Sequence, residues 1–267
     1  MSFRTALLAV CAALPIAAHA APAAPLPLAL NGFELRETGQ WTISVTPADR
    51  LTRGAEHPNR GTDQASYRFG PEGVTLTSEA RKPTAYHARQ PRTEMSESRH
   101  WRIVDGRTDL SAALRIDRRP ARGAMILAEL SSDDDAAPIL SVVTEGDRVL
   151  LRGPGIASPS EAVALGTIGP DHGVRLLLAF SPDGEAKAVV NGTTSRFSLT
   201  PEARMTPVAF RTGAHAIDDI GTSPDRVTVT LTGLGAHHAG AVARTDAQTG
   251  AQTDAQTGAG AASGPRT

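Results

Sequence analysis

The chain contains 267 residues, with 27 basic and 28 acidic side chains and a formal net charge of −1 at pH 7. This near-neutral balance argues against general nucleic-acid binding, which requires a basic surface. Any anionic ligand therefore has to be held by a local cluster of basic side chains, and we expect no nucleic-acid partner.

The first 20 residues have the pattern of a signal peptide. Arg4 supplies the positive charge, residues 6–18 form an apolar segment interrupted only by Pro15, and Ala18-His19-Ala20 fits a cleavage site. The apolar segment is too short to span a bilayer comfortably, and no second such segment follows. We therefore expect a secreted or periplasmic protein with no membrane attachment once the signal peptide is removed.

The mature chain would contain no cysteine, because the single cysteine of the sequence, Cys11, lies in the signal peptide. Its stability then has to come from a packed core rather than from disulfide bonds. Residues 21–27 form an Ala/Pro tether, and residues 239–267 form a repetitive tail of Ala, Gly, Thr and Gln that we expect to be disordered. The remaining residues, 28–238, fit a single domain, which we expect to be monomeric.

In this domain apolar residues alternate with polar ones or form short continuous runs, separated by Gly, Pro, Asp and Asn. The pattern predicts β-strands, with hairpin turns at Ser181-Pro182-Asp183-Gly184 and Asn191-Gly192. No segment keeps a helical periodicity, so helices should be few and short. The expected fold is all-β, a two-sheet β-sandwich of jelly-roll (concanavalin-like) type with a concave groove for a long polymer. The predicted strands cover residues 41–46, 65–69, 74–78, 92–97, 110–116, 125–130, 139–144, 148–151, 163–165, 174–180, 186–190, 208–212 and 227–231.

The strand predicted at residues 92–97 carries a row of polar side chains on one face. Arg92, Glu94 and Ser96 alternate with residues that include the apolar Met95, and residues two apart in a strand share a face. Such a row is either a solvated outer face or the floor of a polar groove. We favour the floor of a groove.

Several segments resemble, in order and spacing, the strand motifs of one family. Residues 91–96 match a P-R-[ST]-E-L-R motif through Glu94. The other matching segments are residues 40–43, 126–131 (motif Q-I-H), 188–192 (V-N-G), 210–215 (F-K-A-G-x-Y) and 225–234 (the last strand). On these motifs the domain is similar to the β-jelly-roll alginate lyases, polysaccharide lyase family 7.

The chain departs from the family's motifs at four positions. The motif histidine falls on Ser131, the glutamine on Glu129, the lysine on Arg211 and the tyrosine on His215. The resemblance implies an exported enzyme that cleaves alginate or a related uronic-acid polysaccharide by β-elimination, with an acidic polysaccharide as its partner. We expect no metal and no cofactor, because neither Asp133-Asp134-Asp135 nor His237-His238 has the spacing of a metal site.

A uronate lyase neutralises the C6 carboxylate, removes the C5 proton and protonates the leaving glycosidic oxygen. Arg92 occupies the motif position suited to the first task, because a bidentate guanidinium stabilises an enolate-like charge. We expect Glu94 to orient Arg92 rather than to react. The alternative is an outward-facing Arg92 paired with Glu94 or Glu97, an ion pair that contributes little.

His215 stands where the family has its acid/base tyrosine, and an imidazole can act as base and as acid near neutral pH. The alternative is a histidine that makes one backbone hydrogen bond at a strand end. Tyr86 and His87 precede the Arg92 strand, on a loop expected to rim the groove. Either one is a candidate for the acid or for a substrate contact; otherwise both pack the loop.

Glu129 replaces an amide that, in the family, helps to hold the substrate carboxylate. A carboxylate there repels a uronate unless it is protonated or paired with Arg211 or Arg92. Three interpretations remain open. Glu129 is protonated and donates a hydrogen bond, or the substrate is held differently, or the strand register differs by one and Glu129 faces solvent.

Two other functions remain possible from the sequence. A groove that keeps its arginine without the usual acid and base would bind a carbohydrate without cleaving it. A glycoside hydrolase would instead use Glu94 or Glu97 together with Glu129, with the two carboxyl groups about 5–9 Å apart.

Overall fold

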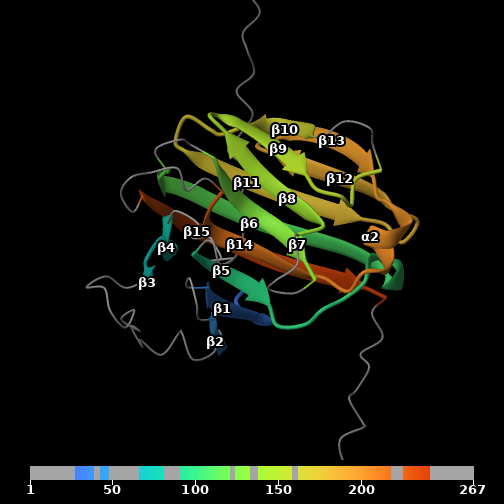
Figure 1. The fold of residues 1–267 in the computed structure, drawn as a ribbon, viewed down its shortest axis with the longest axis horizontal. Coiled ribbons are helices and arrows are strands. Elements are labelled where there is room, and N and C mark those ends of the chain that lie inside the picture. The colour runs from blue at the N-terminus through green and yellow to red at the C-terminus, as the bar shows by residue number, and fades with distance from the viewer. Residues whose placement is uncertain are drawn as a thin grey trace, which may run out of the picture.

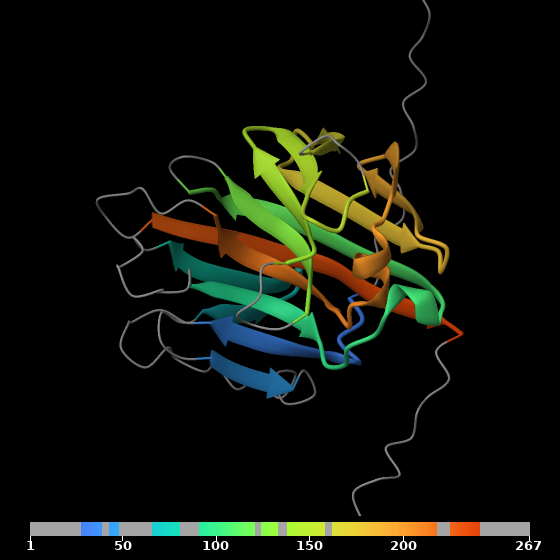
Figure 2. The same ribbon diagram turned by 45° about the vertical axis from the view of Figure 1, so that its right-hand side comes forward.

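The structure is a computed structural model that describes residues 28–38, 43–47, 66–80, 91–120, 124–132, 138–157, 162–217 and 225–240. In this part of the chain two antiparallel β-sheets lie face to face (Figures 1 and 2). The two helical segments among these residues are short, a 3₁₀ turn η1 (Ile103–Asp105) and a helix α2 (Pro201–Met205). None of the described helices is long and apolar enough to cross a membrane.

The first sheet has eight strands and the second has seven. In each sheet, strands from distant parts of the sequence lie side by side, so residues far apart in the chain become neighbours. The eight-stranded sheet runs β10 (Val163–Thr167), β9 (Arg148–Arg152), β8 (Leu140–Glu145), β7 (Met125–Ser131), β14 (Ala209–Ala216), β5 (Arg92–Glu97), β1 (Phe33–Thr38) and β2 (Ile43–Pro47). The seven-stranded sheet runs β13 (Thr193–Ser198), β12 (Glu185–Val190), β11 (Gly173–Phe180), β6 (Arg107–Arg118), β15 (Asp225–Ala239), β4 (Gly73–Ala80) and β3 (Tyr67–Gly70).

The core lies between the two sheets and is built by the alternating residues of each strand. In β11 every second side chain from Val174 to Phe180 is buried, and the side chains between them are more exposed. Met95 of β5 is fully buried in the same core. This alternation follows from the pleat of the strands, which sends successive side chains to opposite faces of a sheet.

The predicted all-β sandwich is confirmed, and each of the predicted strands overlaps an observed strand. The predicted Asn191-Gly192 turn joins β12 to β13 with φ angles of 48° and 89°, the left-handed values that a two-residue hairpin turn requires. Strands β1 and β13 were not predicted. Each buries few apolar side chains, Phe33 and Leu35 in β1 and Phe197 in β13, so the sequence pattern is weak.

Candidate functional site

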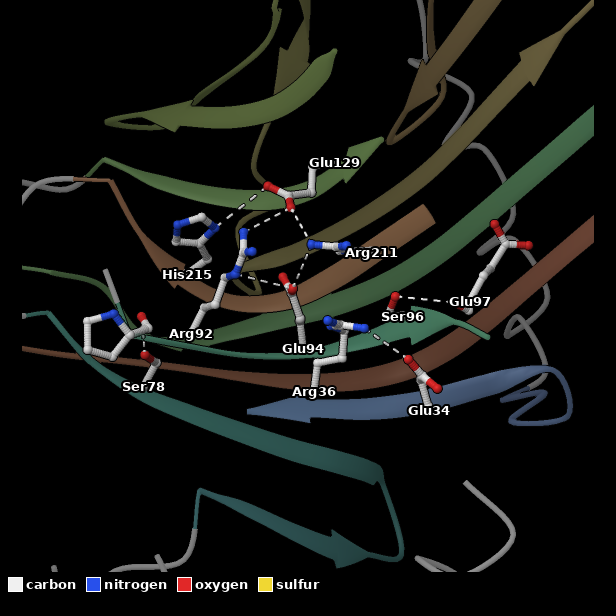
Figure 3. Close-up of polar contacts among 11 residues, drawn as sticks. Glu34, Arg36, Ser78, Arg92, Glu94, Ser96, Glu97, Glu129, Arg211 and His215 are labelled. Carbon is white, nitrogen blue, oxygen red and sulfur yellow. Dashed lines mark hydrogen bonds and ion pairs between the residues drawn. The ribbon is translucent and has the colours of Figure 1, made fainter. Parts of the chain in front are cut away.

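Three adjacent strands, β7, β14 and β5, bring five of the predicted site residues together at the centre of the eight-stranded sheet. His215 of β14 is the cross-strand partner of Arg92 of β5. Arg211 of β14 is the partner of Glu129 of β7. Glu94 follows Arg92 on the same face of β5, and the five side chains point toward one another (Figure 3). We call Arg92, Glu94, Glu129, Arg211 and His215 the charge cluster.

A β-bulge in β7 sets the direction of Glu129. The pairing of β7 with β8 shifts between Ile126 and Ala128, so two steps along β7 face one step along β8. The hydroxyl of Thr212 donates a hydrogen bond of 2.7 Å to the carbonyl of Leu127, within the bulge. The extra residue lets Leu127 and Ala128 both enter the core and turns Glu129 to the side of Arg92. Glu129 is 2% exposed, so the alternative in which it faces solvent is wrong.

Gly213 lets β14 approach β5 closely beside the charge cluster. It lies opposite Glu94, between Arg211 and His215 on their strand. A Cβ atom at this position would lie 2.4 Å from the carbonyl oxygen of Thr93 and 2.6 Å from the Cα atom of Glu94. Both neighbours are backbone atoms, so a side chain at residue 213 would force the two strands apart.

The charged groups of the cluster neutralise one another. Arg92 Nη1 donates a hydrogen bond of 3.1 Å to Glu129 Oε1, and Arg92 Nε lies 3.4 Å from Glu94 Oε1. Arg211 Nη1 lies 3.8 Å from an oxygen of each carboxylate, Glu94 Oε1 and Glu129 Oε1. Each guanidinium therefore lies within ion-pair distance of both carboxylates. This is the pairing with Arg211 and Arg92 that a carboxylate at residue 129 requires.

The cluster has a buried layer and an accessible layer. The side chains of Arg211, Glu94 and Glu129 are 1%, 3% and 1% exposed. Those of Arg92 and His215 are 10% and 13% exposed. Arg92 and His215 are thus the more exposed members of the cluster, and the buried residues hold these two in place. The alternative of a solvated surface pair is therefore not observed, because Arg92 pairs with Glu94 where both side chains are largely buried.

The His215 imidazole is neutral at physiological pH. Burial lowers the pKa of His215 to about 3, and the positive charges of Arg92 and Arg211 act in the same direction. The Glu129 carboxylate, with Oε2 3.8 Å from His215 Nδ1, opposes this effect but is shared with both guanidinium groups. The imidazole is therefore unprotonated at neutral pH, which is the state that a general base requires.

This depressed pKa predicts a loss of stability in acid. The unfolded chain protonates His215 near pH 6.5, whereas the folded chain does so near pH 3. Protons therefore bind preferentially to the unfolded state between these values, and stability falls as pH falls from about 6.5 toward 3. His215 should contribute a slope of up to about 1.4 kcal/mol per pH unit in this window. Urea unfolding at several pH values measures the slope, and His215→Gln should reduce it; equal slopes in both proteins would contradict the prediction.

The remaining predicted residues lie elsewhere. Tyr86 and His87 fall outside the described residues. Ser131, at the motif histidine position, is 1% exposed. Glu97 alternates with the cluster residues of β5 and turns to the inner face, where its carboxylate contacts Trp101 and His238. No group of three or more His, Cys, Asp or Glu side chains suited to a metal ion occurs in the described ranges.

Thr212 and Gly213 were missed by sequence reasoning, although both lie within the segment that matches F-K-A-G-x-Y. The glycine of that motif was a usable signal, because a glycine inside a strand often marks a close backbone approach or a bulge. The Thr212 hydroxyl gave no such signal, since its partner is a backbone carbonyl on another strand.

No protein-family model matches the sequence, and no curated protein matches it. Solved structures do match. The alginate lyase PA1167 from Pseudomonas aeruginosa has 19% identity and a TM-score of 0.62 over 79% of this chain and 99% of that one. A variant of the family 7 alginate lyase A1-II′ in complex with a product, GGG, has 16% identity and a TM-score of 0.63 over 78% and 96%. The PL7 alginate lyase AlyA1 from Zobellia galactanivorans has 13% identity and a TM-score of 0.58 over 79% and 96%. At these identities the chain shares the fold of polysaccharide lyase family 7, as the motif resemblance implied.

Proposed function

Because the chain shares the fold of the family 7 alginate lyases, we propose that it is an exported polysaccharide lyase. Its substrate would be alginate or a related uronic-acid polysaccharide, cleaved by β-elimination. The observation that carries this proposal is the pairing of Arg92 with His215 across two strands. A cation and a neutral imidazole are the accessible members of the cluster, and these are the groups that the reaction needs.

In the proposed reaction Arg92 binds the C6 carboxylate of the uronate. Its positive charge stabilises the enolate-like anion that forms when C5 loses its proton, so it acts most strongly in the transition state. Glu94 and Glu129 fix the orientation of the guanidinium through contacts of 3.4 and 3.1 Å. Arg211 compensates the second negative charge of this carboxylate pair.

His215 is the proposed general base. It accepts the C5 proton on Nε2. The positive charges of Arg92 and Arg211 oppose this step in the free protein, and the negative C6 carboxylate bound by Arg92, together with Glu129 at 3.8 Å from Nδ1, would offset them in the complex. The C5–H electron pair becomes the C4–C5 double bond, and the bond from C4 to the glycosidic oxygen breaks. His215 then returns the proton to the leaving oxygen, which restores the neutral imidazole. Tyr86 and His87 remain predicted alternatives for this acid step.

The ligand class and the location are part of the proposal. The A1-II′ lyase has been solved as variants with a product, GGG, and with a substrate, GGMG. We infer the same class of acidic oligosaccharide for the charge cluster of this chain. The signal-peptide pattern of residues 1–20 supports export to the periplasm or the medium.

The direct test is the absorbance of the unsaturated uronate product. The purified protein should produce this absorbance with alginate, glucuronan or another polyuronate, and not with a neutral polysaccharide of similar length. Circular dichroism establishes that the sample is folded β-protein. A folded sample that gives no absorbance with any polyuronate would refute the lyase proposal.

A carbohydrate-binding protein without activity is the second candidate. It is favoured by one observation: the low pKa of His215 makes this imidazole a weak base, and the motif histidine is replaced by Ser131. Saturable binding of a polyuronate with no product over a long incubation would support it. A glycoside hydrolase fits less well, because Glu97 lies on the other face and Glu94 and Glu129 are nearly inaccessible.

A further inference from the structure

A second site lies at the other end of β5. A pocket of about 980 Å³ opens where β5 and β15 end and where β1 and β6 begin. Figure 2 shows this edge of the sandwich, where the red end of β15 meets the green segment that follows β5. The side chains that matter for ligand binding are those of Trp101, His238, Arg99, Arg102 and Arg107.

The pocket is separate from the charge cluster. Glu97, which lines it, is five residues from Arg92 along an extended strand, a separation of about 16 Å. The two side chains also belong to opposite faces of β5, and Figure 3 shows Glu97 at the far end of the strand from Arg92. A ligand in one site therefore leaves the other accessible.

Buried Glu97 holds in place the two aromatic side chains Trp101 and His238, which we call the aromatic wall of the pocket. One oxygen, Oε2, accepts hydrogen bonds from Trp101 Nε1 at 2.6 Å and from the Phe210 amide at 2.9 Å. The other, Oε1, lies 2.7 Å from His238 Nε2. Glu97 is 7% exposed, and both of its carboxylate oxygens already have hydrogen-bond partners within the protein. They are therefore not available to bind a ligand. The ring centroids of Trp101 and His238 are 4.8 Å apart.

The hydrogen bonds of His238 continue to Thr108, whose hydroxyl lies 3.1 Å from Nδ1. A carboxylate, an imidazole and a hydroxyl in series can form a nucleophilic triad. Thr108 is 2% exposed, however, so a substrate cannot reach its hydroxyl. The series instead holds the His238 ring against Trp101, which points to binding rather than to catalysis.

Arginines surround this aromatic wall. Arg102 is paired with Asp105, with Nη2 2.8 Å from Oδ1. Arg99 and Arg107 are exposed and form no ion pair with another described residue. Three arginines against Asp105 and Glu97 give the lining a formal net charge of +1 with histidine neutral. The pocket thus offers two available cations beside an indole.

We propose that this pocket is a second, non-catalytic binding site for an acidic oligosaccharide. The indole of Trp101 contacts the apolar face of a sugar ring, and Arg99 and Arg107 pair with its carboxylates. The ligand class rests on the proposed function, whereas the existence of an anion-binding aromatic pocket does not. Such a site would retain a polyuronate chain on the protein while another part of it occupies the charge cluster.

The test uses the fluorescence of Trp101 in the full chain. The sequence has two tryptophans, so Trp41→Phe leaves Trp101 as the single reporter, and Arg92→Ala prevents turnover. An alginate tetrasaccharide should change the fluorescence with a saturable dependence on concentration, and a neutral tetrasaccharide should not. Adding Arg99→Ser and Arg107→Ser should weaken the Kd at least tenfold. The matched control is Arg148→Ser with Arg196→Ser, which removes two exposed charges on β9 and β13 and should leave the Kd unchanged.

Three results would overturn the proposal: no saturable change with the acidic tetrasaccharide, equal binding of the neutral one, or the same Kd in the Arg99/Arg107 variant and the control. A lower unfolding midpoint in that variant would implicate misfolding, so the Arg99→Lys and Arg107→Lys pair is also measured and should retain the wild-type affinity within about threefold. These titrations measure binding and need no turnover. They therefore test the pocket even if the protein proves to have no lyase activity.

Discussion

Replacing Arg211 by Met should lower the free energy of unfolding by about 3–5 kcal/mol. The Arg211 side chain is 1% exposed and lies within 3.8 Å of the carboxylates of Glu94 and Glu129. Its removal leaves two buried negative charges with Arg92 as their remaining guanidinium in the cluster. Removing one partner of a buried ionic group costs far more than the net contribution of the group, because the other charge stays desolvated. Urea unfolding followed by circular dichroism measures the loss.

Two comparisons make this prediction specific. Arg196→Met, at an exposed position of β13, should change stability by no more than about 0.5 kcal/mol. Adding Glu129→Gln to Arg211→Met should restore part of the lost unfolding free energy. The second substitution removes one of the two buried negative charges that Arg211→Met leaves beside a single guanidinium. A loss below about 1 kcal/mol for Arg211→Met would mean that the cluster is hydrated and that its charges are screened.

Replacing Arg92 by Ala should reduce kcat/KM on a polyuronate by at least about 10³, the upper range for loss of one donor to a developing oxyanion. The reduction is expected to be this large because Arg92 is the accessible cation of the cluster and supplies a full charge. Arg92→Lys should restore little, since a single ammonium cannot contact Glu94, Glu129 and a substrate carboxylate with the geometry of a guanidinium. Initial rates of product absorbance measure both variants.

The control for Arg92 is Arg148→Ala, an exposed arginine at the start of β9 in the same sheet, which should keep wild-type kcat/KM. A second readout separates chemistry from misfolding. Arg92 lowers the pKa of His215, so Arg92→Ala should raise that pKa, and NMR titration of the imidazole would follow it. If Arg92→Ala retained activity within tenfold, carboxylate neutralisation by this residue would be wrong.

The sequence predicted the all-β class and most strands because these depend on local alternation. The row of Arg92, Glu94 and Ser96 on one face of β5 is a direct consequence of the strand pleat, whatever the strand packs against. Motif order then pointed to Glu129, Arg211 and His215 before their contacts were known. The turn at Asn191-Gly192 was readable for the same local reason, since few residue pairs tolerate positive φ angles.

The side of the sheet on which Glu129 lies required the tertiary structure, because a one-residue bulge held by the Thr212 hydroxyl reverses the direction of every side chain beyond it. The division of the cluster into a buried and an accessible layer is likewise a property of three strands packed together. So is the pocket at Trp101, where Glu97 meets His238 from 141 positions later in the chain. Alternation along one strand fixes which residues share a face, whereas burial and charge pairing depend on neighbours that the fold supplies.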